Sequence, residues 1–215
     1  MHKLYTFTVI IVMITLTLTG NTQESLNLPD PIISNDLMKA LRNRGTYRSF
    51  NPEPLSRQIV AEILWAAYGV NNSKTGRRTV ATAFNMREMS IYVLTKEGGF
   101  FYNADEHALV KKTGEDIRDL IATQKYAASV PLHLIYVADY DLAKKQTPEW
   151  ISGFTEQYSI MHTGQISQNV YLYCASKGLG TIVRDVVKKD VIGEKLGLQT
   201  NQKIITSQAV GYPGQ

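Results

Sequence analysis

Residues 130–139 read VPLHLIYVAD, and this nearly continuous apolar run predicts a buried β-strand. Residues 115–129 before it, EDIRDLIATQKYAAS, have the pattern of a helix. Residues 147–177 after it are helical in pattern almost throughout, either as two helices or as one long helix with a break near Gly164. The middle of the chain therefore predicts a strand between two helical segments.

The rest of the chain continues this mixture of helices and strands. Asn35 or Asp36 is the expected N-cap of the first helix, and Ser56 and Gly69 are expected to bound the second. Strands and helices alternate without regular βαβ units, which predicts an α+β or mixed α/β fold with helices packed on a sheet. The further predicted elements are helices at 36–44 and 57–68, a loop at 71–85, a β-hairpin with strands at 88–95 and 100–103, a strand within 178–186, a helix at 188–198 and a final strand within 202–214.

Length and charge narrow the class of protein. The chain has 215 residues, enough for one sizeable core, and a formal net charge of +4. Its basic residues are scattered and form no run of like charges, so we expect no nucleic-acid partner. A mildly basic balance is compatible with a small ligand that carries phosphate.

The N-terminus predicts export. A basic start at Lys3 and a short apolar run at 7–18 are typical of a secretory signal peptide, because the run is too short to span a bilayer. We therefore expect a signal peptide at 1–23, a lead-in segment at 24–36 and one domain at 37–215. The expected location is the periplasm, with no membrane span after signal removal. The alternatives are a cytoplasmic protein or one anchored by an uncleaved segment.

Common catalytic and metal-binding patterns are missing from the sequence. Cys174 is the only cysteine and lies in an apolar helical run, so we interpret it as a packed core thiol. The sequence has no G-x-S-x-G motif. We expect no metal site, because the histidines that follow the predicted signal peptide are widely separated: His107, His133 and His162.

A second pattern, around residue 173, imitates a nicotinamide-binding enzyme. Tyr173 and Lys177 have the spacing of the Tyr/Lys dyad in short-chain dehydrogenases, and Gly178 and Gly180 follow them. In that family the glycine-rich turn comes first, near the N-terminus. We interpret the two glycines as a helix C-cap followed by a tight turn.

The segment RGTYRSF, residues 44–50, is the strongest candidate for anion binding. Arg44 and Arg48 can point the same way if the segment stays near-helical, and guanidinium groups bind phosphate oxygens in pairs. Gly45 lets the backbone approach a ligand, and Thr46 adds a hydroxyl donor. The alternative is an exposed helix end in which arginine complements the helix dipole, and the local pattern by itself favours that alternative.

The order of motifs along residues 37–214 closely resembles the nitroreductase superfamily of flavin enzymes, in particular its short single-domain bacterial members. The motifs that carry this resemblance are, in order, RGTYRSF, LWAAYGVNN, RRTVATAFN, SIYVLT, SVPLHLIYVAD, HTGQISQNVYLYCASKGLGT and VGYPG. It implies an α+β fold with a central, mostly antiparallel sheet flanked by helices. It also implies an intertwined homodimer with FMN in two clefts at the subunit interface.

The resemblance implies three groups of FMN-binding residues. The first holds the flavin phosphate and the N1/O2 edge of the ring, and the second is a loop that reaches the flavin from the partner subunit. The third is a turn over the ring and its N5 atom. The groups are Arg44, Gly45, Thr46 and Arg48; Thr82, Ala83 and Asn85; and Ile182, Val183, Arg184 and Asp185.

The sequence departs from the family pattern at two places. The usual Pro and Ser of the second motif are Ala81 and Thr82. Many relatives also have a basic residue after the last strand that binds the phosphate, and none follows it in this sequence. Arg44 and Arg48, with Arg184, are therefore expected to make more of the phosphate contact.

The implied reaction is ping-pong: NAD(P)H delivers hydride to flavin N5, and a nitroaromatic, quinone-like or related acceptor then takes the electrons. Arg48 is the candidate for stabilising negative charge on the reduced cofactor. No side chain is expected to act as a general acid or base, because the flavin supplies the chemistry. An exported enzyme needs another electron donor, since nicotinamide cofactors are chiefly cytosolic. The alternatives are a non-catalytic flavin-binding carrier or sensor of the cell envelope, and an unrelated envelope binding protein.

Overall fold

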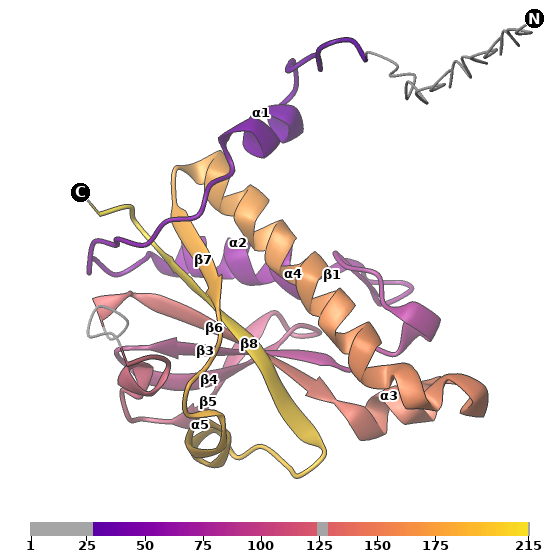
Figure 1. Ribbon diagram of the computed structural model, residues 1–215. Coiled ribbons are helices and arrows are strands. Elements are labelled where there is room, and N and C mark those ends of the chain that lie inside the picture. Colours follow the sequence, from indigo (N-terminus) through magenta and orange to yellow (C-terminus); the bar gives the residue numbers. More distant parts are fainter. Residues whose placement is uncertain (1–27, 124–128, 215) are drawn as a thin grey trace, which may run out of the picture. The chain divides into compact units, whose positions relative to one another are not determined.

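The computed structural model describes residues 28–123 and 129–214 (Figure 1). Contacts group Ile33–Gln215 into one compact unit, which is the part considered below. The predicted signal peptide at 1–23 lies outside the described residues, as does the start of the lead-in segment. No helix within 28–123 or 129–214 is long and apolar enough to cross a membrane.

The compact unit is built on a six-stranded sheet in which every neighbouring pair is antiparallel. The strand order is β5-β4-β3-β6-β8-β7. The strands are β3 (Met89–Thr95), β4 (Gly98–Asn103), β5 (Ala108–Thr113), β6 (Leu132–Asp139), β7 (Gly180–Arg184) and β8 (Gln202–Gly211). The predicted buried strand is thus confirmed as β6, which lies inside the sheet between β3 and β8.

Strand β6 is buried on both faces. Leu134 and Tyr136 belong to the core cluster beneath helices α2 (Arg57–Tyr68) and α4 (Thr155–Lys177). Ile135 and Val137 alternate with them and pack in a second cluster with helix α5 (Lys189–Leu196). Successive side chains of a strand point to opposite faces, so a strand covered on both sides needs apolar residues throughout. This explains the continuous run in the sequence.

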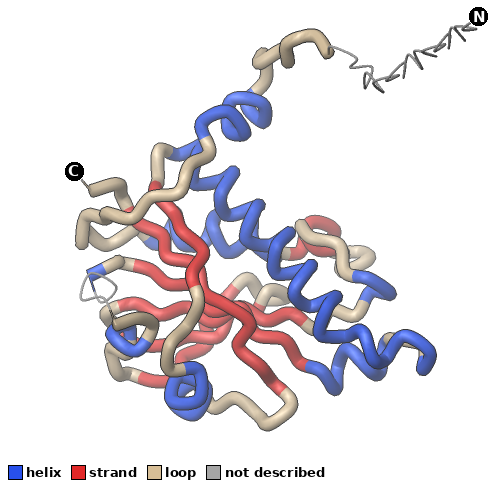
Figure 2. The backbone as a smooth tube through the Cα atoms, viewed as in Figure 1, coloured by secondary structure: helices blue, strands red, loops and turns tan. Residues whose placement is uncertain are grey.

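Helices cover both faces of this sheet, as Figure 2 shows. Asn35 is the N-cap of helix α1 (Asp36–Asn43), and its side chain accepts a hydrogen bond from Met38 N. Ser56 is the N-cap of helix α2, and its hydroxyl accepts a hydrogen bond from Ile59 N. Both predicted caps are confirmed, with Asn35 rather than Asp36 in the first helix. The α+β fold class is also confirmed.

The helix predicted at 115–129 is wrong where the structure describes it. Only Arg118–Leu120 forms a short 3-10 helix, and residues 124–128 lie outside the description. Ile117 and Ile121 are both buried in the second cluster, and their spacing of four imitates a helical face. The Arg118 guanidinium instead bonds to Asp116 and to the Val130 carbonyl, which ties this segment to the start of β6 as an irregular connection.

Helix α4 runs unbroken through Gly164, so the break expected there is absent. The segment predicted to be helical at 147–177 instead contains a 3-10 helix at Glu149–Phe154, followed directly by α4. A Cβ atom at Gly164 would meet nothing within 4 Å, so this glycine marks no tight contact within the described chain. Elements that the sequence pattern did not predict are β1 (Val70–Asn72), β2 (Arg77–Arg78), the 3-10 helix Ala83–Asn85, β5 and α3 (Tyr140–Gln146).

Two glycines of α5 give a matched test of this local structure. Gly193 lies inside the helix, and an added Cβ there would meet Leu198 at an ordinary contact distance of 3.6 Å. Gly197 ends the helix at φ 70°, a conformation that costs other residues energy. We expect Gly193→Ala to raise the free energy of unfolding by about 0.5–1 kcal/mol and Gly197→Ala to lower it by about 1 kcal/mol. Urea denaturation measures both, and equal effects would contradict the assignment of the helix end.

Candidate functional site

The candidate arginine segment lies along the edge strand β7. Arg44 ends helix α1, and its amide donates to the Ala40 carbonyl. Two residues beyond Gly45, the Tyr47 amide donates to the Thr181 carbonyl at 3.1 Å. A Cβ at Gly180 would lie 3.0 Å from Tyr47 Cβ, so glycine at 180 permits this close approach. The first and third predicted motifs are therefore neighbours.

Tyr171 of α4 links these two segments. Its hydroxyl oxygen lies 3.5 Å from Thr46 Oγ1 and accepts a hydrogen bond from Val183 N at 3.1 Å. The guanidinium carbon of Arg44 lies 5.4 Å from the centre of the Tyr171 ring, within cation–π range. Arg44, Thr46 and Val183 thus meet around one tyrosine.

Tyr171 does not stand out in the sequence. Its one local signal is that it precedes Gly178, the αL residue that ends α4, by seven residues. Seven residues are about two helical turns, so Tyr171 lies beside a strand that leaves this helix end and folds back along it. That signal becomes useful only once the direction of β7 is known.

Arg44 and Arg48 form no ion pair with an acidic side chain among residues 28–123 and 129–214. Both arginines are exposed. Arg184 is half-buried at the end of β7, and its carbonyl accepts from the hydroxyls of Thr206 and Ser207. The segment at residues 44–50 therefore offers two exposed positive charges beside β7.

The remaining residues of the β7 turn differ in exposure and partners. Ile182 and Val183 are half-buried, whereas Asp185 is exposed and forms an ion pair with Lys189 at 3.0 Å. The hydrogen bond from Lys189 lowers the pKa of the Asp185 carboxyl group, so this group is ionised at neutral pH. Asp185 holds the start of α5 and adds no free acid to the site.

The end of the chain lies against the same segment. The Asn51 amide donates to the Tyr212 carbonyl, and the Gly214 amide donates to the Ser49 carbonyl, each at 2.9 Å. The sequence after β8 therefore runs beside the residues that follow Arg48.

The second predicted motif lies elsewhere in the chain. The Ala83 amide donates to His162 Nε2 at 2.9 Å, and the Thr82 hydroxyl accepts from the Arg87 amide. Asn85 Oδ1 accepts from Arg87 Nε. His162 precedes Tyr171 by nine residues on α4, which corresponds to about 13 Å along the helix. One chain therefore brings the first and third motifs together and keeps the second apart.

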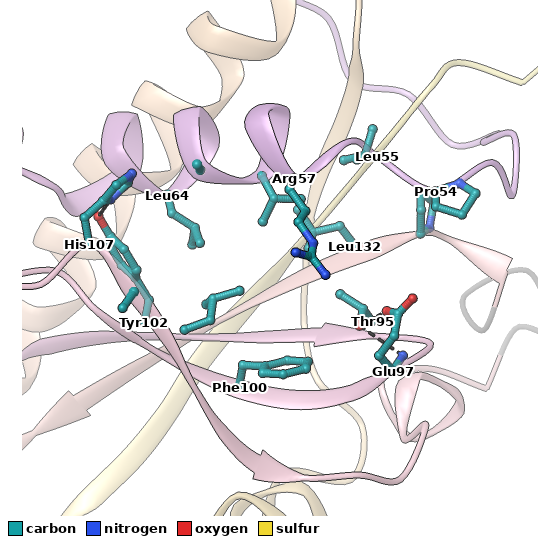
Figure 3. A pocket seen from close by; sticks show the side chains of 15 residues that line it. Pro54, Leu55, Arg57, Leu64, Thr95, Glu97, Phe100, Tyr102, His107 and Leu132 are labelled. Carbon is teal, nitrogen blue, oxygen red and sulfur yellow. Dashed lines mark hydrogen bonds between the residues drawn. The ribbon is translucent and has the colours of Figure 1, made fainter.

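The cavity in Figure 3 contains none of the predicted site residues. Its volume is about 620 Å³, and it lies between α2 and strands β3–β5. Arg57 and Glu97 lie toward one end of it and Tyr102 and His107 at the other. Tyr102 Oη is hydrogen-bonded to His107 Nδ1 at 2.8 Å, and burial raises the Tyr102 pKa to about 12. The walls are otherwise mostly apolar, and no nucleophile–base pair is assembled here.

The pair that imitates a dehydrogenase dyad is structural. Tyr173 Oη donates to Glu62 of α2 at 2.8 Å, and Lys177 Nζ forms an ion pair with the same carboxylate at 2.9 Å. Hydrogen bonds from Gln58, Lys177 and Tyr173 lower the Glu62 pKa to about 2. The pair therefore fastens α4 to α2, and Gly178 is a helix C-cap as expected.

Comparison with known proteins identifies the family of the chain. The model of the nitroreductase family matches residues 41–212. The chain belongs to the nitroreductase family. A relative in Methanocaldococcus jannaschii that carries the nitroreductase name is 32% identical over 173 residues, covering 76% of this chain and 84% of the relative.

Solved structures share the nitroreductase fold. One from Ralstonia eutropha JMP134, also named as a nitroreductase, has a TM-score of 0.77 at 32% identity and covers 88% of this chain and 89% of that one. The NADPH:FMN oxidoreductase of Vibrio harveyi, solved with NAD+, has a TM-score of 0.61 at 18% identity, with 84% and 70% covered. At that identity it supports the fold alone. As a nitroreductase family member, the chain is an oxidoreductase.

Other reactive groups in the described chain form no second centre. No group of three or more His, Cys, Asp or Glu side chains in 28–123 and 129–214 is placed to hold a metal ion. Cys174 is buried in the first core cluster, as expected of a packed thiol, and burial raises its pKa to about 12.

We expect the Cys174 thiol to be unreactive in the folded protein. A thiol with a raised pKa is protonated at neutral pH, and burial also blocks access by reagents. Titration with an aromatic disulfide reagent at pH 8 should show no modification within minutes in buffer and one thiol per chain in denaturant. Rapid modification of the folded protein would contradict this assignment.

Proposed function

We propose that this nitroreductase is an FMN-dependent oxidoreductase that takes electrons from NAD(P)H. The observation that carries the proposal is the junction at Tyr171, where the arginine segment and β7 meet beside the exposed cations Arg44 and Arg48. Such a junction fits a ligand with a terminal phosphate and a flat ring. When bound, FMN supplies the hydride and electron chemistry.

The residues present fit this cofactor in charge and shape. Arg44 and Arg48 provide guanidinium forks for the phosphate and for the pyrimidine edge of the ring. Gly45 has no side chain to block the backbone, and the half-buried Ile182 and Val183 offer an apolar surface to a ring. Fixed cations stabilise negative charge best when they need no reorganisation, and the Tyr171 contacts provide that fixity for Arg44.

A second copy of the chain is part of the proposal. Thr82, Ala83 and Asn85 lie near His162, about 13 Å along α4 from Tyr171, so within one chain they stand apart from the first and third groups. A homodimer brings this loop from the partner to the junction. Exposed apolar side chains on α1 and α4 favour such an association. They are Leu37, Leu41, Ile160 and Met161.

The proposed acceptors are nitroaromatic or quinone-like molecules, used in a ping-pong cycle in which the donor leaves before the acceptor binds. The Vibrio harveyi protein, an NADPH:FMN oxidoreductase solved in complex with NAD+, supports a nicotinamide donor by analogy of fold. The alternative is a flavin carrier or sensor without turnover. We also propose export to the periplasm, which would call for a different physiological donor.

The first test is the colour and turnover of the purified protein. It should be yellow with a flavin absorption band, and anaerobic NADH or NADPH should bleach that band. Addition of a nitroaromatic or a quinone should restore it. A colourless protein that does not take up added FMN would contradict the flavin proposal, and a yellow protein inert to all donors and acceptors would favour the carrier. Light scattering during size-exclusion chromatography tests the dimer.

Arg44→Ala should weaken FMN binding by at least about tenfold, because one charge-assisted phosphate contact is lost. Arg57→Ala is the matched control. It removes the same charge at the start of α2, beside the cavity that contains no candidate FMN residue. Flavin fluorescence titration measures both dissociation constants. Equal affinities in the two variants would exclude a phosphate role for Arg44.

Tyr171→Phe should weaken FMN binding by a factor of about three to ten, because Val183 N loses its acceptor and the β7 turn loses a fixed contact. Tyr173→Phe is the control. It removes the same hydroxyl from the same helix but breaks a bond to Glu62 instead. The proposal predicts that only the first variant changes flavin affinity, and a larger effect of Tyr173→Phe would contradict it.

Export is tested separately by fractionation of cells that express the full chain. We expect the protein in the periplasmic fraction with a new N-terminus near residue 23, as determined by mass spectrometry of the intact protein. Retention of Met1 in a cytoplasmic fraction would contradict the proposal without affecting the FMN site.

A further inference from the structure

The loop at residues 82–87 adopts an unusual backbone conformation. Phe84, Asn85 and Arg87 have φ angles of 51°, 55° and 51°, although none of them is glycine. Side chains rarely tolerate this left-handed region, and three such residues within four positions must be held by their surroundings. Backbone of this kind is concentrated at functional sites, so the groups that hold it become candidates for a functional role.

A buried pair of side chains holds the start of this loop. The Ala83 amide donates to His162 Nε2 at 2.9 Å, and His162 Nδ1 lies 2.7 Å from Glu88 Oε1. Glu88 and His162 are both 0% exposed. Because a backbone amide can only donate, Nε2 is the acceptor and the ring proton resides on Nδ1. His162 therefore donates to Glu88, and the carboxyl group selects the tautomer that can bind the loop.

The pair also shapes the surface next to the loop. The Tyr158 ring stacks on His162 with centroids 6.2 Å apart, and the Phe84 ring meets Tyr158 edge-on at 6.2 Å. Phe84 also meets Trp150 edge-on at 6.3 Å. Phe84 is 44% exposed and Trp150 is 75% exposed. The series of ring contacts that begins at the buried histidine therefore ends at an exposed aromatic surface.

We propose that Glu88 and His162 are positioning residues that lock the loop at residues 82–87 in its cofactor-binding form. The inference rests on the proposed function, in which this loop completes the FMN site of the partner chain. Buried ionisable pairs are weak stabilising devices, because desolvation offsets most of the attraction between the partners. A role in holding one tautomer of His162 beneath a strained loop therefore explains this pair better than a contribution to the stability of the fold does.

The decisive variant is His162→Leu, which removes both bonds and keeps an apolar side chain in the space. Thr163→Val is the control. Thr163 is the next buried residue of α4, and its hydroxyl bonds only to the Ser159 carbonyl and the Met89 sulfur. His162→Gln tests rescue, because one planar amide can accept from Ala83 and donate to Glu88. The measurements are the FMN dissociation constant of the full chain and hydrogen exchange at the Ala83 amide.

We expect His162→Leu to bind FMN about tenfold more weakly than Thr163→Val, and to unfold at a lower temperature because Glu88 stays buried without its partner. His162→Gln should stay within about threefold of the unaltered chain. Exchange at the Ala83 amide should be slow in the unaltered chain and fast in His162→Leu. Equal FMN affinity in the leucine and valine variants, or failure of glutamine to restore it, would overturn the inference.

The two proposals fail in different ways. If the unaltered chain does not bind FMN, the proposed function is wrong, and Ala83 exchange still tests the lock on the loop. If FMN binds but Ala83 exchanges as fast as an exposed amide in the unaltered chain, the lock is wrong and the function stands. That second measurement needs no variant, so it decides the matter even where His162→Leu does not fold.

Discussion

Helix α4 packs against the sheet through Ile166, Val170 and Cys174, and this contact fixes where the candidate site residues can lie. Asn169 Nδ2 donates to the Ala66 carbonyl of α2, and Gln208 Nε2 donates to the Ser167 carbonyl, so polar bonds hold the helix from two sides. The unbroken helix sets the spacing of the residues on it. His162 and Tyr171 are nine residues apart, which corresponds to about 13 Å along the helix axis.

That separation has a chemical consequence. Tyr171 holds the arginine segment beside β7, and His162 holds the strained loop, so in the proposed FMN site one chain supplies two separate parts. Two chains related by a dyad can present the parts to each other twice. A site divided in this way forms no closed cavity in a single chain, which accounts for the lack of predicted site residues around the cavity next to α2.

The proposed phosphate contact differs from that of a nucleotide-binding α/β fold. A nucleotide-binding α/β fold meets phosphate with a glycine-rich turn and a helix N-terminus. Here the expected groups are arginine side chains that follow the C-terminus of α1, and a helix C-terminus carries the opposite partial charge. Arg44 complements that charge locally while its guanidinium lies over Tyr171. The two interpretations of RGTYRSF, a charged helix end and an anion site, are therefore compatible.

The sequence by itself determined the features that depend on neighbours along the chain. The caps at Asn35 and Ser56, the hairpin of β3 and β4, and the doubly buried β6 follow from local hydrogen bonding and from strand periodicity. The order of the motifs also indicated the family. The spacing of apolar residues wrongly predicted a helix at residues 115–129. Ile117 and Ile121 are buried with the spacing of a helical face, but Arg118 bonds to the Val130 carbonyl and holds the segment as an irregular connection.

Only the tertiary structure decided the roles of Tyr171 and His162. Each binds a residue far away in sequence, Thr46 and Val183 for the tyrosine and Ala83 and Glu88 for the histidine. No periodicity records such contacts, because they depend on which helix face meets which loop after the sheet has formed. For the same reason the sequence placed the candidate FMN residues in three groups, and the packing of α4 decided which two of them meet.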